Sequence, residues 1–317
     1  MNEITTTRAN ALIDPTLHVW HAEVALYLFL GGIVAGVMVL TGLALLRRPE
    51  AQRSRALALT PWHAPVLLTA GLLFLWLDLE NRWNVLRFYL TFRPASPMSW
   101  GAWILLAIYP ISILAAWAST PALLRDAVLA RFPRLRAPAD WAVRRVRSLA
   151  VWSVLAGIAL GVYTGVLLGA MAARPLWNSA ILGPLFLVSG LSTGAALMLL
   201  ARLSEPERRL LGRIDTGLIV VEIILIALWL LGLAAGGAAA RDAVRLFFGG
   251  PFTAAFWTLV VALGLLTPLL AGVIEHRRGA VPGRAAAIFV LIGGLALRWI
   301  IVLAGQHAGY VAELTLR

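Results

Sequence analysis

The sequence has 317 residues and a formal net charge of +12; 61% of its residues are hydrophobic and only 13% are charged. Because a soluble domain is roughly 45–50% apolar and about 25% charged, this composition excludes an ordinary water-soluble protein and indicates an integral membrane protein. Cysteine is absent, which excludes disulfides, thiolate-bound zinc and an iron–sulfur cluster held by the chain itself.

Eight apolar runs are long enough to cross a membrane as helices. A hydrocarbon core of roughly 30 Å needs about 20 helical residues. The runs are too long for barrel strands and do not alternate in polarity, so we predict an all-α integral membrane protein with eight transmembrane helices. In chain order the predicted helices cover residues 19–46, 61–79, 98–118, 148–171, 179–201, 215–236, 252–274 and 284–305.

The predicted helices form a single membrane domain over residues 1–317, with no soluble domain and a longest loop at about 119–147. We expect two four-helix bundles within it, 19–171 and 179–305. GGIVAG (31–36) in the first predicted helix echoes SGLSTGAA (189–196) in the fifth. Small residues at this spacing let helices approach closely, so both segments are predicted at helix contacts.

The arginines predict the orientation. The loops after the first, third, fifth and seventh helices hold eighteen arginines, whereas the other loops and both termini hold eight. The positive-inside rule then places both termini outside, in the periplasm, of a protein in the bacterial inner membrane. The same rule explains the positive charge without nucleic-acid binding. The polar N-terminus and the long first run predict no cleavable targeting segment.

Several polar side chains lie toward the predicted outer face, and they come from different helices. Ionisable groups at membrane depth are costly and usually face a partner, a cavity or a ligand. Two histidines open the first helix and are three residues apart, which predicts a shared helix face, with Glu23 on a different face. The outer-face candidates are His18, His21, Asp78, Tyr163 and Arg174.

Each candidate also has a structural alternative. The two histidines could be interfacial residues, Asp78 could pair with Arg82 across one turn, and Tyr163 could be a packed aromatic ring. A second group lies deeper or toward the inner side and could form a proton path. It comprises His63, Asp215, Glu222 and Arg298, although Arg298 could simply neutralise Glu222 or snorkel outward.

Other chemistries are not predicted. The histidines lie near helix ends rather than facing one another at one depth, which excludes a bis-histidine haem, and no cluster is tight enough to predict a metal site. No nucleophile, phosphate-loop or HExxH motif occurs. The outer-face groups instead suit a quinone headgroup, which needs hydrogen-bond donors, a proton route and an apolar slot. Histidine suits the proton work, a carboxylate can orient it, and a tyrosine hydroxyl is a further donor.

One segment carries a family resemblance. DLENRWNVLRFYLTFRPASPMSWGAW (78–103) resembles the signature of the NrfD/polysulfide reductase membrane-subunit family. ALYLFLGGIVAG (25–36), YTGVLLGAMAARPLWNS (163–179) and LRWIIVLAGQ (297–306) agree in order, so the resemblance covers nearly the whole chain. The chain departs from it at Leu79-Glu80-Asn81-Arg82-Trp83, where many members have Gly-Arg-Pro. Within the SPMSWG motif, Ser99 is predicted to cap the third helix.

The resemblance implies a membrane anchor of a respiratory complex. Such a subunit has no redox centre of its own and exchanges electrons with a four-cluster iron–sulfur subunit, which serves a molybdopterin-type catalytic subunit docked on the outer face. It implies a quinone site near that face, with His21, and with it His18, at the start of the first helix. Asp78 and Tyr163 match the aspartate of the second helix and the tyrosine of the fourth.

The expected function is therefore quinone-linked electron transfer with menaquinone or ubiquinone. His21 and Asp78 are expected to handle protons, and Tyr163 to hold a headgroup oxygen. The alternatives are the same fold acting also as a proton-translocating module, a structural anchor without a quinone site, and a secondary transporter.

Overall fold

The computed structural model describes residues 20–47, 53–79, 82–90, 92–171, 173–280 and 283–308. Within these residues, eight helical spans are long and apolar enough to cross a membrane, which confirms the predicted count. They are α1 (Ala22–Arg47), the continuous α2 (Arg55–Leu59), η2 (Thr60–Trp62) and α3 (His63–Asp78), α5 (Pro97–Ser119), α8 (Val146–Gly169), α9 (Leu182–Leu200), α10 (Glu205–Ala234), the continuous α12 (Thr253–Ala255), η5 (Phe256–Leu266) and α13 (Thr267–Arg277), and α14 (Arg284–His307).

Shorter helices connect these spans. They are η3 (Arg82–Asn84), α4 (Val85–Leu90), α6 (Ala122–Arg131), η4 (Pro133–Leu135), α7 (Arg136–Arg144) and α11 (Ala238–Arg245). The segment 119–147, predicted as a loop, therefore contains a helical hairpin. The sixth span begins at Glu205 rather than near residue 215, because its first turns are charged and hydropathy alone misses them. The backbone N–H of Ser204 donates to Glu207 Oε2 at 3.0 Å and helps to define this earlier start.

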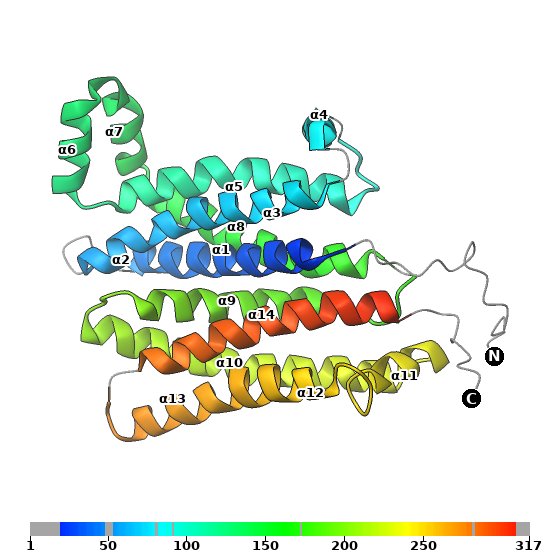
Figure 1. Ribbon diagram of the computed structural model, residues 1–317. Coiled ribbons are helices and arrows are strands. Elements are labelled where there is room, and N and C mark those ends of the chain that lie inside the picture. The colour runs from blue at the N-terminus through cyan, green and yellow to red at the C-terminus, as the bar shows by residue number, and fades with distance from the viewer. Residues whose placement is uncertain are drawn as a thin grey trace.

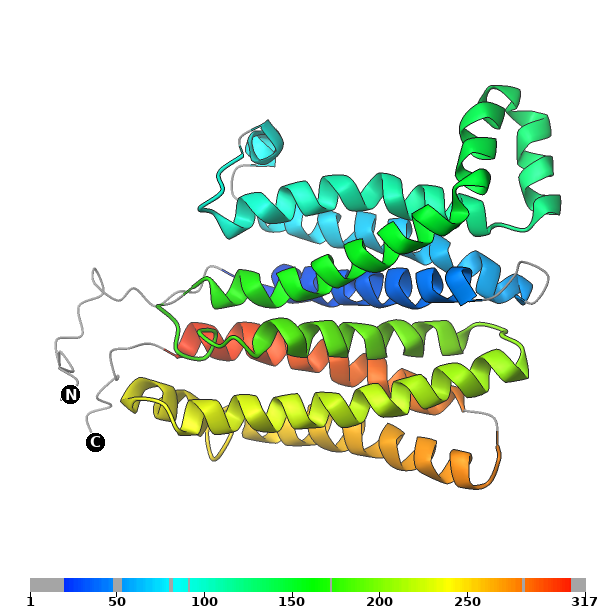
Figure 2. The same ribbon diagram turned by 180° about the vertical axis from the view of Figure 1, so that it is seen from behind.

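The spans lie side by side, with α1 in the middle of the stack (Figure 1). α3, α5 and α8 lie on one side of α1, and α9, α10, α13 and α14 lie on the other, as the reverse view also shows (Figure 2). Since α1 packs against α3 and α8 and also against α9 and α14, it joins the two halves of the chain. The division into two four-helix bundles stays a prediction.

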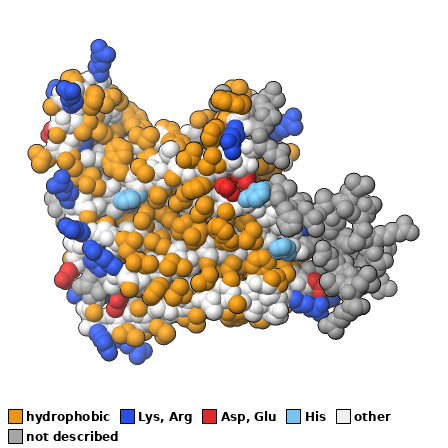
Figure 3. All heavy atoms as spheres, in the orientation of Figure 1, with side chains coloured by type: hydrophobic (Ala, Val, Ile, Leu, Met, Phe, Trp, Pro, Cys, Tyr) orange, Lys and Arg blue, Asp and Glu red, His pale blue; other side chains and the backbone are white. Residues whose placement is uncertain are grey.

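The two ends of the stack differ in charge. Arginine side chains gather at the end that carries the α6–α7 hairpin, and hydrophobic side chains cover the visible face between the ends (Figure 3). We call this the arginine-rich end, and the end near α4 and α11 the opposite end. The apolar face and its charged borders are what a bilayer requires of a spanning protein.

Glycines bring α1 and α9 into backbone contact. A Cβ atom on Gly194 would lie 2.7 Å from the Cα atom of Gly36, and one on Gly36 would collide with the carbonyl oxygen of Gly190. The two helices can therefore approach this closely only where both carry glycine. This contact explains the small-residue segments at 31–36 and 189–196.

We predict that Gly194→Ala destabilises the protein by about 1–3 kcal/mol, because the added methyl group must push the two backbones apart. The measurement is thermal unfolding of the purified protein in mild detergent. Gly217→Ala is the matched control, since Gly217 is also helical and nothing lies within 4 Å of a Cβ atom there. Equal unfolding temperatures for Gly194→Ala and the unmodified protein would contradict the prediction.

Candidate functional site

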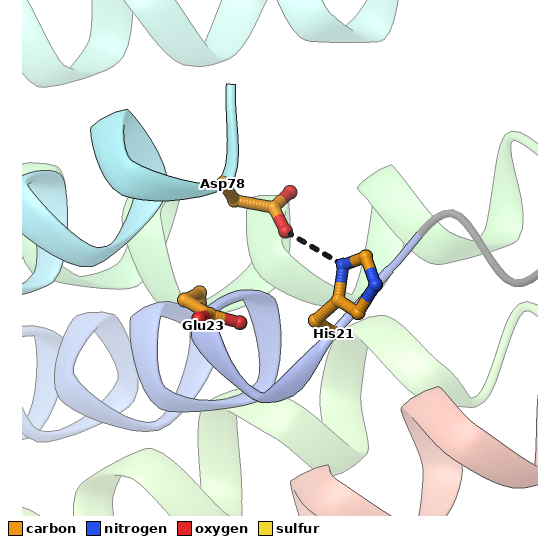
Figure 4. Close-up of side chains that lie close together, drawn as sticks. All are labelled: His21, Glu23 and Asp78. Atoms are coloured by element: carbon orange, nitrogen blue, oxygen red, sulfur yellow. Dashed lines mark ion pairs between the residues drawn. The ribbon is translucent and has the colours of Figure 1, made fainter. Parts of the chain in front are cut away.

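His21 and Asp78 meet at the opposite end of the stack. Asp78 is the last residue of α3, and His21 lies just before the first residue of α1. His21 Nδ1 lies 3.6 Å from Asp78 Oδ1 (Figure 4). The histidine side chain is 73% exposed and the aspartate side chain 12%. This pair can therefore exchange a proton with water on one side while the carboxylate faces the protein on the other.

Glu23 joins this pair, contrary to the predicted helix face. The ligand atoms of His21, Glu23 and Asp78 all lie within 4.8 Å of one another (Figure 4). The prediction was wrong because His21 precedes the helix, so helical spacing does not relate it to Glu23. Glu23 Oε2 is buried and has no hydrogen-bond partner among the described residues. The trio offers the ligand types that a divalent cation would accept, whereas no metal site was predicted.

A polar cavity of about 440 Å³ surrounds these side chains. Arg82 does not pair with Asp78 there. Its guanidinium lies 5.4 Å from the Trp76 ring centroid and donates to the Leu77 carbonyl oxygen at 3.1 Å. Asp78 therefore pairs with His21 and not with Arg82. The lining residues are His21, Glu23, Leu77, Asp78, Leu79, Arg82 and Trp83.

A second cavity, of about 270 Å³ and mostly apolar, lies next to the first. Leu79 lines both, so the polar cavity forms a mouth beside an apolar slot. The slot is built by α1, α3, α4, α5 and α8. Its lining residues are Tyr27, Leu72, Leu75, Trp76, Leu79, Val85, Tyr89, Met98, Gly101, Ala102, Leu105, Tyr163 and Leu167.

Three phenols line the apolar slot. Tyr163 was predicted from the sequence, and the structure adds Tyr27 and Tyr89. The Tyr27 and Tyr163 side chains are buried, and neither hydroxyl forms a hydrogen bond with another described residue. Partial burial raises the pKa of the Tyr89 phenol above its ordinary value, with a smaller contribution from Tyr109. The slot therefore presents protonated hydroxyl donors between apolar walls.

The SPMSWG motif shapes one wall of the slot. A Cβ atom on Gly101 would collide with the Tyr163 hydroxyl, so only glycine leaves room for this phenol. α5 begins at Pro97 after Ser96, so the predicted cap at Ser99 is wrong. Ser99 lies inside the helix, and its Oγ accepts a hydrogen bond from the Arg93 backbone N–H at 3.0 Å. The motif thus fixes the loop entering α5 and holds Gly101 against α8.

Arg174, predicted with the outer-face candidates, lies outside both cavities. Its buried side chain donates to the carbonyl oxygens of Gln306 at 3.3 Å and Ala308 at 3.4 Å, at the end of α14. It lines neither the polar cavity nor the apolar slot. His18 lies outside the described residues. The structure thus brings His21 and Asp78 together, places Tyr163 in the neighbouring slot, and gives Arg174 a separate role at a helix end.

Three of the four deeper candidates form a buried network in the second half of the chain. Asp215 Oδ1 accepts a hydrogen bond from Ser192 Oγ at 2.6 Å. Ser189 lies beside Glu222, and its Oγ accepts a hydrogen bond from Arg298 Nη1 at 2.9 Å. The fourth candidate, His63, is not part of this network. Its side chain is exposed at the start of α3, with Nδ1 2.8 Å from the Thr60 carbonyl oxygen.

Comparison with known proteins gives consistent matches. A family model described as polysulphide reductase, NrfD, matches residues 11–309. Protein NrfD from Escherichia coli is 34% identical over 309 residues, covering 91% of this chain and 95% of that protein. A polysulfide reductase chain from Wolinella succinogenes is 31% identical over 313 residues, covering 91% and 94%. A tetrathionate reductase subunit from Salmonella typhimurium is 27% identical over 255 residues, covering 79% and 66%.

Proposed function

The chain belongs to the polysulphide reductase NrfD family, and from this premise we propose that it is the quinone-reactive membrane subunit of a multi-subunit reductase. One relative is named as a chain of polysulfide reductase and another as a subunit of tetrathionate reductase, which supports a membrane subunit that works with a catalytic partner. In this proposal an iron–sulfur subunit docks on the opposite end and passes electrons between the quinone site and a molybdopterin-type catalytic subunit.

One observation carries the proposal: an apolar slot with phenol donors meets a solvent-open His–Asp pair at Leu79. A bound quinone would supply two-electron, two-proton redox chemistry in this slot. The residues that line the slot match the chemical groups of a quinone. The apolar walls suit a ring and isoprenoid tail, and the phenols suit the two carbonyl oxygens, because buried donors need partners.

The chain's own residues would have separate roles in quinone binding and proton transfer. Tyr163 donates a hydrogen bond to one headgroup oxygen, and Gly101 leaves it the room to do so. Asp78 lies 3.6 Å from His21 Nδ1 and orients the imidazole ring. His21 then carries protons between the site and water, because its side chain is 73% exposed and an imidazole can act as a general acid and base. In this division the polar mouth gives the protons access to water, and the apolar slot holds the ring and the tail.

Orientation follows from charge in this proposal. The arginine-rich end lies in the bacterial cytoplasm, and the opposite end, with both termini, lies in the periplasm. The quinone site and the docking surface for the iron–sulfur subunit are then on the periplasmic side. Fusion of a periplasm-dependent reporter enzyme at either terminus should give activity, and an inactive fusion at both termini would reverse the orientation.

We predict that Tyr163→Phe weakens quinone binding about tenfold, because one hydrogen bond of roughly 1–1.5 kcal/mol is lost while the ring stays in place. The measurement is a titration of the purified subunit with a short-chain quinone analogue, followed by tryptophan fluorescence. Tyr109→Phe is the matched control: Tyr109 lies on α5 outside the slot, and its hydroxyl contacts Thr69 Oγ1 at 3.0 Å.

Two other results would count against the proposal. Equal affinities for Tyr163→Phe and Tyr109→Phe would remove Tyr163 from the site. A subunit that binds no quinone analogue, yet still assembles with its partners, would support a purely structural anchor instead.

A further inference from the structure

A cavity of about 350 Å³ opens at the arginine-rich end, between α10, α13 and the start of α14. α10 packs against α13, and α13 packs against α14. A Cβ atom on Gly272 of α13 would collide with Thr216 Oγ1 of α10, so these two helices are in close contact beside the cavity. Packed helices therefore shape the cavity, and its volume could hold roughly ten waters at about 30 Å³ each, or a polar group of similar size.

Basic side chains from two helices line this cavity. Arg209 and Arg213 lie one turn apart on α10, and His276 and Arg277 lie at the end of α13. Arg209 is already engaged, because it donates to the Gly279 carbonyl oxygen at 2.6 Å. Arg213 and Arg277 form no hydrogen bond or ion pair with another described residue. One guanidinium group on each helix is therefore available to a ligand.

Two acids also line the cavity, and both are hydrogen-bonded elsewhere. Asp215 is buried, and its Oδ1 accepts a hydrogen bond from Ser192 Oγ on α9 at 2.6 Å. Glu275 Oε1 accepts a hydrogen bond from the Gly283 backbone N–H at 2.8 Å, just before α14. Three arginines therefore face two carboxyl groups, and neither carboxyl group pairs with the two available guanidinium groups. This excess of positive charge attracts an anion.

The α13 side of the cavity is apolar and faces outward. Val273 lines the cavity and is 36% exposed. Leu270 and Ile274 are exposed as well, and the spacing of the three residues places them on one face of α13. In a helix that spans a membrane, such an exposed apolar face is covered by acyl chains. An apolar strip thus leads from the charged cavity along the surface that the bilayer covers.

The headgroup and chain of an anionic phospholipid match these two features together. A guanidinium group binds phosphate oxygens through two parallel hydrogen bonds, and basic cavities between spanning helices are typical sites for anionic headgroups. A zwitterionic headgroup would bring its own cation to the same arginines, so it complements the excess charge less well. Free phosphate would satisfy the arginines but would gain nothing from the apolar strip beside them.

We propose that this cavity binds the headgroup of one anionic phospholipid. Arg213 and Arg277 hold its phosphate from two helices, and an acyl chain lies along Leu270 and Ile274. The bound lipid thereby bridges α10 and α13, whose free arginines would otherwise repel one another across the cavity. The cavity shares no lining residue with the quinone slot, so the lipid site does not depend on the proposed quinone function.

The test uses the purified subunit in a neutral detergent, with lipid binding followed by native mass spectrometry. Phosphatidylglycerol and phosphatidylcholine with the same acyl chains are compared, and the wild type should retain one phosphatidylglycerol in preference. Arg213→Gln and Arg277→Gln should each weaken this binding at least about tenfold, the usual effect of losing one hydrogen bond to a charged group. Arg134→Gln is the matched control, because Arg134 is an exposed arginine of the α6–α7 hairpin, at the same end but outside the cavity.

A second measurement locates the lipid. Phosphatidylglycerol with a photoactivatable group on its acyl chain should label the α13 peptide that contains Leu270 and Ile274, and Arg213→Gln should lose this label. Equal binding by the two cavity variants and Arg134→Gln, or labelling spread evenly over the spans, would overturn the proposal. Equal retention of phosphatidylcholine would refute the selection for charge. Inorganic phosphate that competes as well as phosphatidylglycerol would show that the cavity binds a free anion instead of a lipid.

Discussion

Replacement of Asp78 by asparagine is expected to lower quinone-linked turnover by at least about 100-fold, the usual scale for loss of a positioned acid–base group. Asparagine keeps the shape of the side chain but has no carboxylate to accept a proton or to face His21 across the 3.6 Å gap. The complex should still assemble, because Asp78 is the last residue of α3 and is not among the buried residues of that helix. The measurement is turnover with a soluble quinol analogue, normalised to assembled complex.

Asp242→Asn provides the matched control. Asp242 is an exposed aspartate on α11, also at the opposite end, and it pairs with Arg245 at 3.0 Å. Exposed pairs of this kind contribute little, so its turnover should equal that of the wild type. A change of His21 to glutamine should reproduce the loss seen with Asp78→Asn. If both site variants turned over normally, the His21–Asp78 pair could not be the proton-handling group.

The membrane fold was predictable because the apolar runs that determine it occur along the whole chain. Eight apolar runs of sufficient length determine eight spans, whatever the details at their ends. The errors occur where another force sets the boundary. α10 starts ten residues early because a backbone bond to Glu207 stabilises a charged first turn, and the α6–α7 hairpin is amphipathic rather than apolar.

The candidate site was only partly predictable, because it depends on contacts between distant segments. His21 and Asp78 stood out as costly polar residues at helix ends. Tyr27 did not, since it lies inside the apolar run ALYLFLGG and reads as a core aromatic. The hydroxyl group of a tyrosine within an apolar run was the signal that could have identified Tyr27 as a site residue. Glu23 was misplaced because its position relative to His21 depends on where the first helix begins.

Arg298, at the centre of the second half of the chain, carries a buried charge that is expected to affect the stability of the protein strongly. Arg298 is fully buried, its guanidinium lies 5.3 Å from the Phe186 ring centroid, and it donates to Ser189, which lies beside Glu222. Its Nε has no hydrogen-bond partner among the described residues. Burying this charge is therefore only partly offset by hydrogen bonds, so it depends on the opposite charge nearby.

Arg298→Met is accordingly expected to lower the free energy of unfolding by about 3–5 kcal/mol, because it leaves the Glu222 carboxyl group without a buried countercharge. Adding Glu222→Gln should restore part of this loss, with a coupling of about 1–3 kcal/mol, since the stranded charge is removed as well. The measurement is unfolding in mixed micelles with increasing SDS. Arg245→Met, at an exposed pair, should change stability by less than about 1 kcal/mol. Additive losses in the double variant would show that Arg298 and Glu222 act independently, and would reduce Arg298 to a hydrogen-bond donor for the α9 backbone.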